Sequence, residues 1–373
     1  AYVAHFRKKE LSWPLWTDWS SMKRDANFDT SKADGLLAGH LWDGYSVYEA
    51  PATGIDWRKA PLTCITRFQI FTTLLEAYFH TQDPKYTRFL VNHVMEYMKA
   101  YPMVEFVGKG TFGFIDNHTV TLPWHWSMMP KRVEELARAL PLIRICPEVT
   151  DDELLAILHR AYQEACYCRL VMKQWVDKRH NGGKSYIMAM THACAALEDF
   201  KTTDEWSAYS ANLLAQYIGQ SFYPDGQCVE MATSYSGNAA FSAQQLASLL
   251  TEHEGIKAVR PRLAAMVDWS IGLSLPTGKL PSFGDLSARH VAGTIYQPLL
   301  DWLDVPYART ILNRTAGPLP PHTVWPAPGQ GTWGGYYAMR SDWTENALYL
   351  CIDAGPWGTS YHEHGDKLSF VVT

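Results

Sequence analysis

Hydrophobic residues recur at helical spacing through most of the chain. The first clear stripe is Phe68, Phe71, Leu75 and Tyr78, which share one face of a helix, and helical signal dominates from about residue 62. Similar spacing predicts further helices over residues 130–143, 184–199, 238–253, 257–274 and 293–303. Strand signal is almost absent before residue 330. The pattern predicts a mainly α chain whose successive helix pairs form a solenoid or a closed (α/α) toroid.

Helix-start signals support this reading at three places. Asp83 followed by Pro84 is typical of an N-cap and a first helical position. The stretches Thr150–Glu153 and Thr202–Glu205 each have a Thr followed three residues later by a Glu, the spacing of a capping box. We therefore expect helices to begin at all three.

The pattern changes after residue 315. Pro- and Gly-rich punctuation predicts a linker over residues 316–332. Three alternating stretches then predict strands, over residues 336–340, 347–353 and 368–373. Three strands are too few for a stable sandwich. We expect a toroid domain over residues 1–315 and the beginning of an antiparallel β-sandwich domain over residues 333–373, which continues past the last residue.

Composition narrows the class of protein. The chain has 373 residues, of which 47% are hydrophobic and 19% are charged, so a disordered chain is excluded. A net charge of −5 makes a general nucleic-acid binder improbable. No run of about 18 apolar residues predicts a membrane span. No secretory leader is visible in the chain.

Aromatic residues are unusually frequent, with 15 Trp, 20 Tyr and 14 Phe. Trp124 and Trp126 flank a His in an irregular stretch, which suits the wall of a groove where rings stack on a ligand. Packing in the core is the alternative role for each of them.

Three patches carry residues suited to chemistry. The run 178–184 places His180, Asn181 and Lys184 on a Gly-containing turn before a helix, where an anion is favoured. The stretch 223–235 places Glu230 and Tyr235 after a Pro-Asp-Gly turn. A solvated basic loop and an ordinary turn are the simpler interpretations of these two patches.

The third patch contains two histidines and an aspartate. His362 and His364 would project to the same side of an extended stretch, and Asp366 follows them. Such a set suits a metal site or histidine acid–base chemistry. Surface histidines without a special role are the simpler interpretation.

The order of these patches resembles the heparinase II/III-like polysaccharide lyases. The matching stretches are Leu280–Asp285, Met339–Trp343, Asp353–Pro356, His362–Phe370 and the Asp225-Gly-(x)3-Glu230-(x)4-Tyr235 spacing. The resemblance covers most of the chain, thinly over residues 1–180 and firmly over residues 220–373. It implies a helical toroid followed by a β-sandwich-like domain.

The resemblance also implies an activity and roles for residues. That family cleaves uronate-containing polysaccharides by β-elimination. It implies Tyr235 and His362 as catalytic residues, and it implies His180 and Asn181 as the groups that neutralise the substrate carboxylate. It implies His364 as a ligand of one divalent metal ion, either zinc, manganese or calcium, whose other ligands lie beyond the chain's last residue. It implies a periplasmic or secreted protein.

The chemistry of elimination agrees with these residue types. Enolate charge must be neutralised next to the uronate carboxylate, a base must remove a proton, and an acid must protonate the leaving oxygen. We expect Glu230, Lys184, Trp124 and Trp126 to contact the anionic polysaccharide. No motif for an organic cofactor occurs in the sequence.

Two other functions stay open at this point. One is a glycoside hydrolase on a helical toroid, which would use two carboxylates drawn from Asp225, Glu230 and Asp285. The other is a glycan-binding protein without catalysis. The sequence names neither the polysaccharide nor the oligomeric state.

Overall fold

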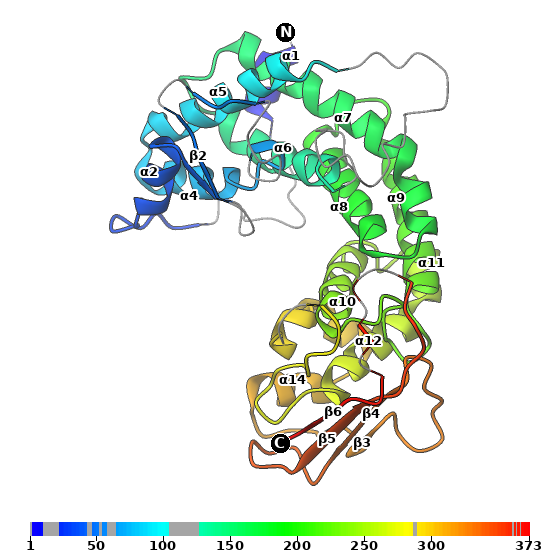
Figure 1. Ribbon diagram of the computed structural model, residues 1–373. Coiled ribbons are helices and arrows are strands. Elements are labelled where there is room, and N and C mark those ends of the chain that lie inside the picture. Colours follow the sequence, from blue (N-terminus) through cyan, green and yellow to red (C-terminus); the bar gives the residue numbers. More distant parts are fainter. Residues whose placement is uncertain are drawn as a thin grey trace. The chain divides into compact units, whose positions relative to one another are not determined.

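The computed structural model describes residues 2–9, 22–42, 47–51, 54–57, 65–103, 127–285, 289–359, 362, 364–365 and 367–373. The chain divides into two compact units (Figure 1). Unit 1 comprises residues 1–171 and 188–207, and unit 2 comprises residues 172–187 and 208–373. The predicted domains, residues 1–315 and 333–373, were separated where the helical pattern changes to a strand pattern, whereas the two units are separated by compactness. The predicted domain limits therefore stay predictions.

Helices make up most of unit 1, together with one short antiparallel hairpin. The helices are α1 (Tyr2–Lys8), α2 (Ser31–Leu37), α4 (Phe71–Thr81), α5 (Pro84–Ala100), α6 (Met129–Ile143) and most of α7 (Asp151–Asp177). The hairpin pairs β1 (His40–Trp42) with β2 (Val47–Glu49). Helices α8 (Asn181–Ala196) and α9 (Thr203–Ser221) contribute residues to both units.

The start of α5 shows why the sequence forms helices here. The Asp83 side chain accepts a hydrogen bond from the Lys85 N–H, and Pro84 occupies the first turn. Leu90 and Val94, at i and i+4, are fully buried on the inner face. The cap and the apolar stripe together confirm the helix predicted from this pattern.

The two predicted capping boxes have different outcomes. Thr150 Oγ1 accepts from the Glu153 N–H at 3.2 Å, and the Thr150 N–H donates to Glu153 Oε2 at 2.9 Å, so the first box is confirmed. At the second, α9 begins at Thr203 as predicted, but the side-chain contacts of a capping box are not formed. Thr202 Oγ1 is buried without a hydrogen-bond partner among the described residues, and Glu205 instead pairs with Arg169.

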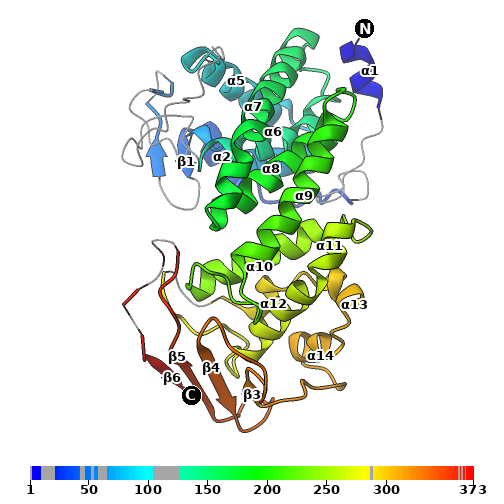
Figure 2. The same cartoon turned by 90° about the vertical axis from the view of Figure 1, so that its right-hand side faces the viewer.

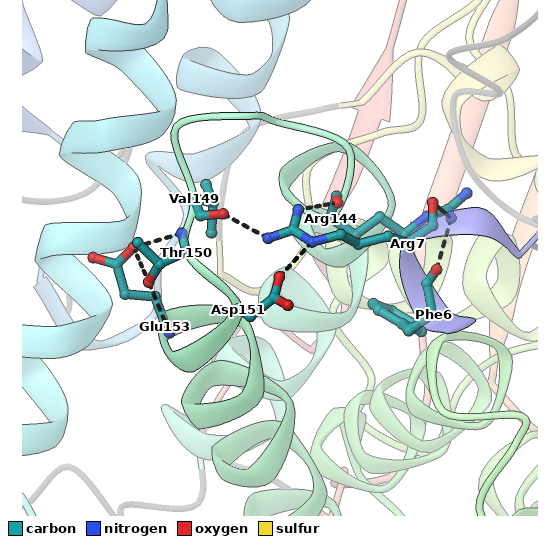
Figure 3. A network of polar contacts seen from close by, with 7 residues as sticks. All are labelled: Phe6, Arg7, Arg144, Val149, Thr150, Asp151 and Glu153. Carbon is teal, nitrogen blue, oxygen red and sulfur yellow. Dashed lines mark hydrogen bonds and ion pairs between the residues drawn. The ribbon is translucent and has the colours of Figure 1, made fainter. Parts of the chain in front are cut away.

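Two arginines fasten α1 to the turn between α6 and α7 (Figure 3). Arg7 donates to the carbonyls of Arg144 and Val149 and to Asp151 Oδ1, at 2.6, 2.5 and 2.8 Å. In return, Arg144 donates to the carbonyls of Phe6 and Arg7 at 2.8 and 2.9 Å. Charged donors on backbone carbonyls stabilise this turn, because they satisfy groups that the helix ends leave unpaired.

Unit 2 combines short helices with a sheet. Its helices include α10 (Thr233–Ala247), α11 (Glu254–Ala258), α12 (Arg260–Gly272), α13 (Leu300–Leu303), α14 (Tyr307–Asn313) and the 3₁₀ turns η1 (Val291–Thr294) and η2 (Gln297–Leu299). The sheet contains β3 (Val324–Trp325), β4 (Tyr336–Arg340), β5 (Tyr349–Asp353) and β6 (Phe370–Val372). All neighbouring strands are antiparallel, in the order β3-β4-β5-β6 (Figure 2).

The sheet packs on the C-terminal end of α12. A Cβ added at Gly272 would lie 2.3 Å from Trp325 Cγ, so only glycine allows the Trp325 ring to approach this closely. The Arg340 side chain donates to the Gly272 carbonyl, and the Tyr349 hydroxyl donates to the Leu273 carbonyl at 2.7 Å. These contacts satisfy carbonyls that the helix end leaves unpaired.

The other face of the sheet is apolar and exposed. The register aligns Tyr337 with Ile352 and Ile352 with Phe370 across β4, β5 and β6. Met339 and Val372 lie in the next row, and both are exposed. Hydrophobic side chains therefore occupy both faces of this sheet.

Several predicted boundaries need correction. Phe68 is buried and stacks on Phe71 with ring centroids 4.5 Å apart, but its φ of 58° places it outside the helix, which begins at Phe71. The helix predicted to reach residue 253 ends at Ala247, because the N–H groups of the next turn bond to carbonyls three residues back. The helix predicted over residues 293–303 is two 3₁₀ turns and the short α13.

The strands after residue 330 agree with prediction, and three earlier ones, β1, β2 and β3, were missed. Strand β4 has the predicted limits, and β5 and β6 begin two residues later than predicted. The β1–β2 hairpin and β3 are only two or three residues per strand, too short for a period-two signal. Within the described residues, no helix is both long enough and apolar enough to cross a membrane.

Candidate active site

Four segments of unit 2 bring the predicted site residues together. They are the start of α8, the turn that leads into α10, the stretch that ends at Asp285, and the stretch after β5 that carries His362. All four belong to unit 2.

Asn181 is the first residue of α8 and is held at both its main chain and its side chain. Its N–H donates to Glu230 Oε1 at 2.9 Å. Its side-chain Nδ2 lies 3.5 Å from His362 Nε2. The carboxyl group of Glu230 thus satisfies one of the N–H groups that the helix start leaves unpaired.

His180, the residue before α8, is neutral at pH 7. Its Nδ1 accepts from the Gly182 N–H at 2.9 Å, and its ring meets the edge of Trp175 with centroids 5.4 Å apart. Burial lowers the pKa of His180 to about 4, and the nearby Lys178 charge contributes in the same direction. A neutral imidazole here can hydrogen-bond an anion but adds no charge.

Glu230 is fully buried, with 0% of its surface exposed. Burial raises the pKa of its carboxyl group above the usual value. Its Oε1 accepts from Asn181, while its Oε2 has no hydrogen-bond partner in the part of the chain that the structure describes. Complete burial places Glu230 behind Asn181 rather than on an accessible surface.

Tyr235 lies in the first turn of α10, and its ring is stacked on His362. The two ring centroids are 3.6 Å apart and the planes differ by 12°. The start of α10 is fixed by Thr233, whose N–H donates to the Phe283 carbonyl at 3.0 Å and whose hydroxyl donates to the Pro281 carbonyl at 2.6 Å. The helix start therefore places the phenol beside the imidazole.

Asp285 connects the two histidines of the third patch. Its Oδ2 lies 2.9 Å from His362 Nδ1, and its Oδ1 lies 2.6 Å from His364 Nε2. The hydrogen bonds from His362 and His364 hold the pKa of Asp285 below its usual value. No local signal predicts this contact, since 77 residues separate Asp285 from His362; only the family resemblance pointed to both stretches.

Lys184 lies one turn into α8, and its amino group bonds to the Asn238 side chain. Its Nζ is also 3.5 Å from the Ser242 hydroxyl. Both partners lie on α10, so Lys184 links α8 to the helix that carries Tyr235.

Two of the three carboxylates of the hydrolase alternative, Asp225 and Glu230, are engaged in other contacts or buried. Asp225 Oδ2 accepts from the Thr332 hydroxyl and from the N–H groups of Trp333 and Gly334, at 3.0, 2.7 and 2.7 Å. Glu230 is buried. This arrangement gives the hydrolase alternative no accessible pair made of these two carboxylates.

Three residues named in the sequence analysis lie outside the described residues: Trp124, Trp126 and Asp366. Among the residues that the structure describes, no group of three or more His, Cys, Asp or Glu could hold a metal ion. The metal site therefore stays a prediction.

The family model for the heparinase II/III N-terminus matches residues 9–308. None of the curated proteins matches significantly. A heparinase III matches with a TM-score of 0.79 and 17% identity, over 99% of this chain and 60% of that chain. The heparan sulfate lyase HepC from Pedobacter heparinus matches with a TM-score of 0.66 and 18% identity, over 100% of this chain and 58% of that chain.

A further heparinase III structure matches with a TM-score of 0.74 and 18% identity, over 100% of this chain and 59% of that chain. The chain thus spans about three fifths of the length of these structures. At this identity the likeness shows the fold. It confirms the predicted class, a mainly α chain of the (α/α) toroid type followed by antiparallel β-structure.

Proposed function

The chain belongs to the heparinase II/III family, and from that premise we propose that it is a polysaccharide lyase that cleaves a uronate-containing polysaccharide by β-elimination. The observation that carries the proposal is the convergence of Asn181, Tyr235 and His362. The imidazole stacks on the phenol at 3.6 Å and lies 3.5 Å from the amide nitrogen. An amide, a phenol and an imidazole are groups suited to the three tasks of elimination.

The reaction sets those tasks. A base removes the proton on the carbon next to the uronate carboxylate, the electron pair forms a carbon–carbon double bond, and the bond to the glycosidic oxygen breaks. An acid delivers a proton to that leaving oxygen. Negative charge grows on the carboxylate side before the bond breaks, so donors placed there lower the barrier.

We assign the substrate carboxylate to the start of α8. Asn181 Nδ2 supplies a neutral donor, and the helix start favours negative charge. His180, kept neutral by its burial, lies next to Asn181 in the chain and is the second candidate donor through Nε2. The Lys184 charge, one turn further, favours the same anion.

Tyr235 is the proton-transfer residue of the proposal, with His362 as its partner. Stacked rings present the phenol oxygen and imidazole Nε2 to one neighbourhood, where a sugar linkage can be flanked by an acid and a base. We assign Glu230 to positioning, because its buried carboxyl group touches the main chain of Asn181 and is closed to solvent.

For the substrate we propose a glycosaminoglycan, with an alginate-like polymer as the competing uronate polymer. The name of one matching structure, a heparan sulfate lyase, supports the first. Large anionic polysaccharides lie outside the cytoplasm, so we also propose a periplasmic or secreted location.

The family resemblance implies a divalent metal ion held by His364. The donor chemistry fits one ligand: His364 Nε2–H donates to Asp285, which leaves Nδ1 as the nitrogen for a metal, and ligating histidines usually donate their other N–H to a carboxylate. When bound, such an ion would supply structural order to the His362–His364 stretch. Metal analysis of the full chain, with His364→Ala beside it, tests this assignment.

An ultraviolet absorbance screen tests the function. The full chain is incubated with heparan sulfate, chondroitin sulfate, hyaluronan and alginate, and the new conjugated double bond is followed together with reducing ends. We expect both signals to rise together on at least one glycosaminoglycan. In parallel, Asn181→Ala should lower the rate more than it changes KM, since its stabilisation grows with the enolate.

Two results would overturn the proposal. New reducing ends without ultraviolet absorbance would identify a hydrolase. Saturable binding of a polysaccharide without either signal would identify a glycan-binding protein.

A further inference from the structure

One carboxylate joins both histidines of the candidate active site. Asp285 uses Oδ2 for His362 Nδ1, at 2.9 Å, and Oδ1 for His364 Nε2, at 2.6 Å. Its own N–H donates to the His362 carbonyl at 2.8 Å. Asp285 therefore binds the main chain and the ring of His362 together, although 37% of its side chain is exposed.

The backbone beneath Asp285 is fixed by neighbours on both sides. The preceding residue, Gly284, has a φ of +73°, and a Cβ there would lie 2.7 Å from Ala232 Cβ and from the His362 carbonyl oxygen. Only glycine fits this conformation and this space. One residue earlier, the Phe283 carbonyl accepts from Thr233 at the start of α10. The same short segment thus holds the helix that carries Tyr235 and the stretch that carries His362.

This geometry determines which nitrogen of His362 carries the proton. An ionised carboxylate can only accept hydrogen bonds, so the imidazole must donate from Nδ1. In the neutral ring Nε2 then keeps its lone pair, and that nitrogen lies 3.5 Å from Asn181 Nδ2. A lone pair on Nε2 is what a base or a hydrogen-bond acceptor at this position requires.

We infer that Asp285 is a positioning residue of the site: it holds His362 as the Nδ1–H tautomer, flat against Tyr235, with Nε2 directed toward Asn181. The catalytic meaning of this inference rests on the proposed lyase function. The tautomer and the ring position are properties of the resting protein and can be measured without substrate.

The first experiment measures the tautomer directly. Imidazole nitrogen chemical shifts of the full chain, labelled with ¹⁵N-histidine and assigned with His362→Gln and His364→Gln, report which nitrogen carries hydrogen. We expect His362 in the Nδ1–H form and His364 in the Nε2–H form. His362 found in the Nε2–H form would overturn the inference, whatever the activity of the protein.

The second experiment changes the carboxylate. The amide of Asp285→Asn has one accepting oxygen where the carboxylate has two, so at least one of the two histidines must change tautomer or lose its bond. We expect kcat to fall about 100-fold or more with little change in KM, as for other residues that orient a catalytic imidazole. Unchanged tautomers and unchanged kcat would overturn the inference.

Asp268 provides a matched control in the same unit. It accepts from the Tyr307 hydroxyl at 3.0 Å and lies 3.7 Å from His322 Nε2, so it is also an aspartate beside a histidine. Asp268→Asn should leave kcat and both His362 and His364 signals unchanged. If no polysaccharide is cleaved by the wild-type chain, the lyase proposal fails, while the tautomer measurement still decides the role of Asp285.

Discussion

Two groups of charged side chains, one in each unit, use a carboxylate in opposite ways. In unit 1, Glu164 is fully buried and pairs with Arg132 and Arg160 at 2.7 and 2.6 Å. The two guanidinium carbons lie 4.8 and 4.9 Å from the Tyr97 ring centroid. In unit 2, Asp285 pairs with two imidazoles and is partly exposed.

The comparison separates a structural role from a reactive one. Arginine is charged at any pH the protein meets, and the buried pairs of unit 1 are closed to solvent. They can contribute to stability and to a unique packing, but no substrate reaches them. An imidazole nitrogen can donate or accept a proton, and 25% of the His362 side chain is exposed. The unit 2 group therefore has the properties that proton transfer needs.

Tyr235→Phe should give the largest effect on activity with almost none on stability. The change removes one hydroxyl and keeps the ring that stacks on His362. We expect turnover to fall by roughly two to four orders of magnitude, the usual worth of a positioned acid or base. Turnover on the polysaccharide found in the absorbance screen, together with urea unfolding, measures both quantities.

The control for that variant is a change of similar size outside the site. Tyr296→Phe also removes one hydroxyl from unit 2, on a ring that packs against Phe241. Its turnover should equal that of the wild type. Near-normal turnover in Tyr235→Phe would contradict the assignment of Tyr235.

Glu164→Gln should give the opposite result, a large loss of stability. Removing this carboxylate breaks the ion pair that each of the buried residues Arg132 and Arg160 makes with Glu164. Breaking a buried pair in this way typically costs about 3–5 kcal/mol. Urea unfolding should show this loss, whereas Glu205→Gln, which breaks an exposed pair with Arg169, should cost about 1 kcal/mol or less.

The result that would contradict this division is a stable Glu164→Gln variant with lost turnover. We expect instead that Glu164→Gln keeps turnover close to that of the wild type under conditions where the variant is still folded. Equal unfolding midpoints for Glu164→Gln and Glu205→Gln would also remove the contrast between the two groups.

The sequence predicted the helical fold well wherever local signals decide. Asp83 with Pro84, and Thr150 with Glu153, form the predicted caps because both partners lie within one turn. Thr202 with Glu205 has the same spacing, but Arg169 on α7 binds the glutamate instead. The ion pair with Arg169, which is distant in the chain, determines where the Glu205 side chain lies. A local sequence pattern cannot predict such a contact.

The candidate active site shows the same limit. Tyr235, His362 and Asn181 were named from the family resemblance, and the structure brings them together. Glu230 was expected to contact substrate because it follows a Pro-Asp-Gly turn, yet its side chain is buried behind Asn181. Burial depends on residues from other segments, so a turn signal alone did not reveal it.

Glu230 combines features of both groups, since it is buried like Glu164 but lies at the site. Glu230→Ala should cost about 1–3 kcal/mol, because the Asn181 N–H loses its buried acceptor. Glu230→Gln keeps an accepting oxygen for that N–H and should cost less. Urea unfolding of the two variants measures the difference, and equal losses would show that the hydrogen bond to Asn181 contributes little.

The smallest predicted effect is a pH-dependent difference in the free energy of unfolding between Glu230→Gln and the wild type. Burial raises the pKa of Glu230 in the folded state above its value of about 4.3 in the unfolded chain. The folded protein therefore binds more protons than the unfolded chain between those two pKa values, and the wild type loses stability as pH rises through that interval. Glutamine does not titrate. The free energy of unfolding of Glu230→Gln should therefore increase relative to that of the wild type as pH rises from 4.5 to 8. Urea unfolding of both proteins across that range measures the gain. A difference that stays constant with pH would show that the Glu230 carboxyl group titrates alike in both states, as an accessible side chain does.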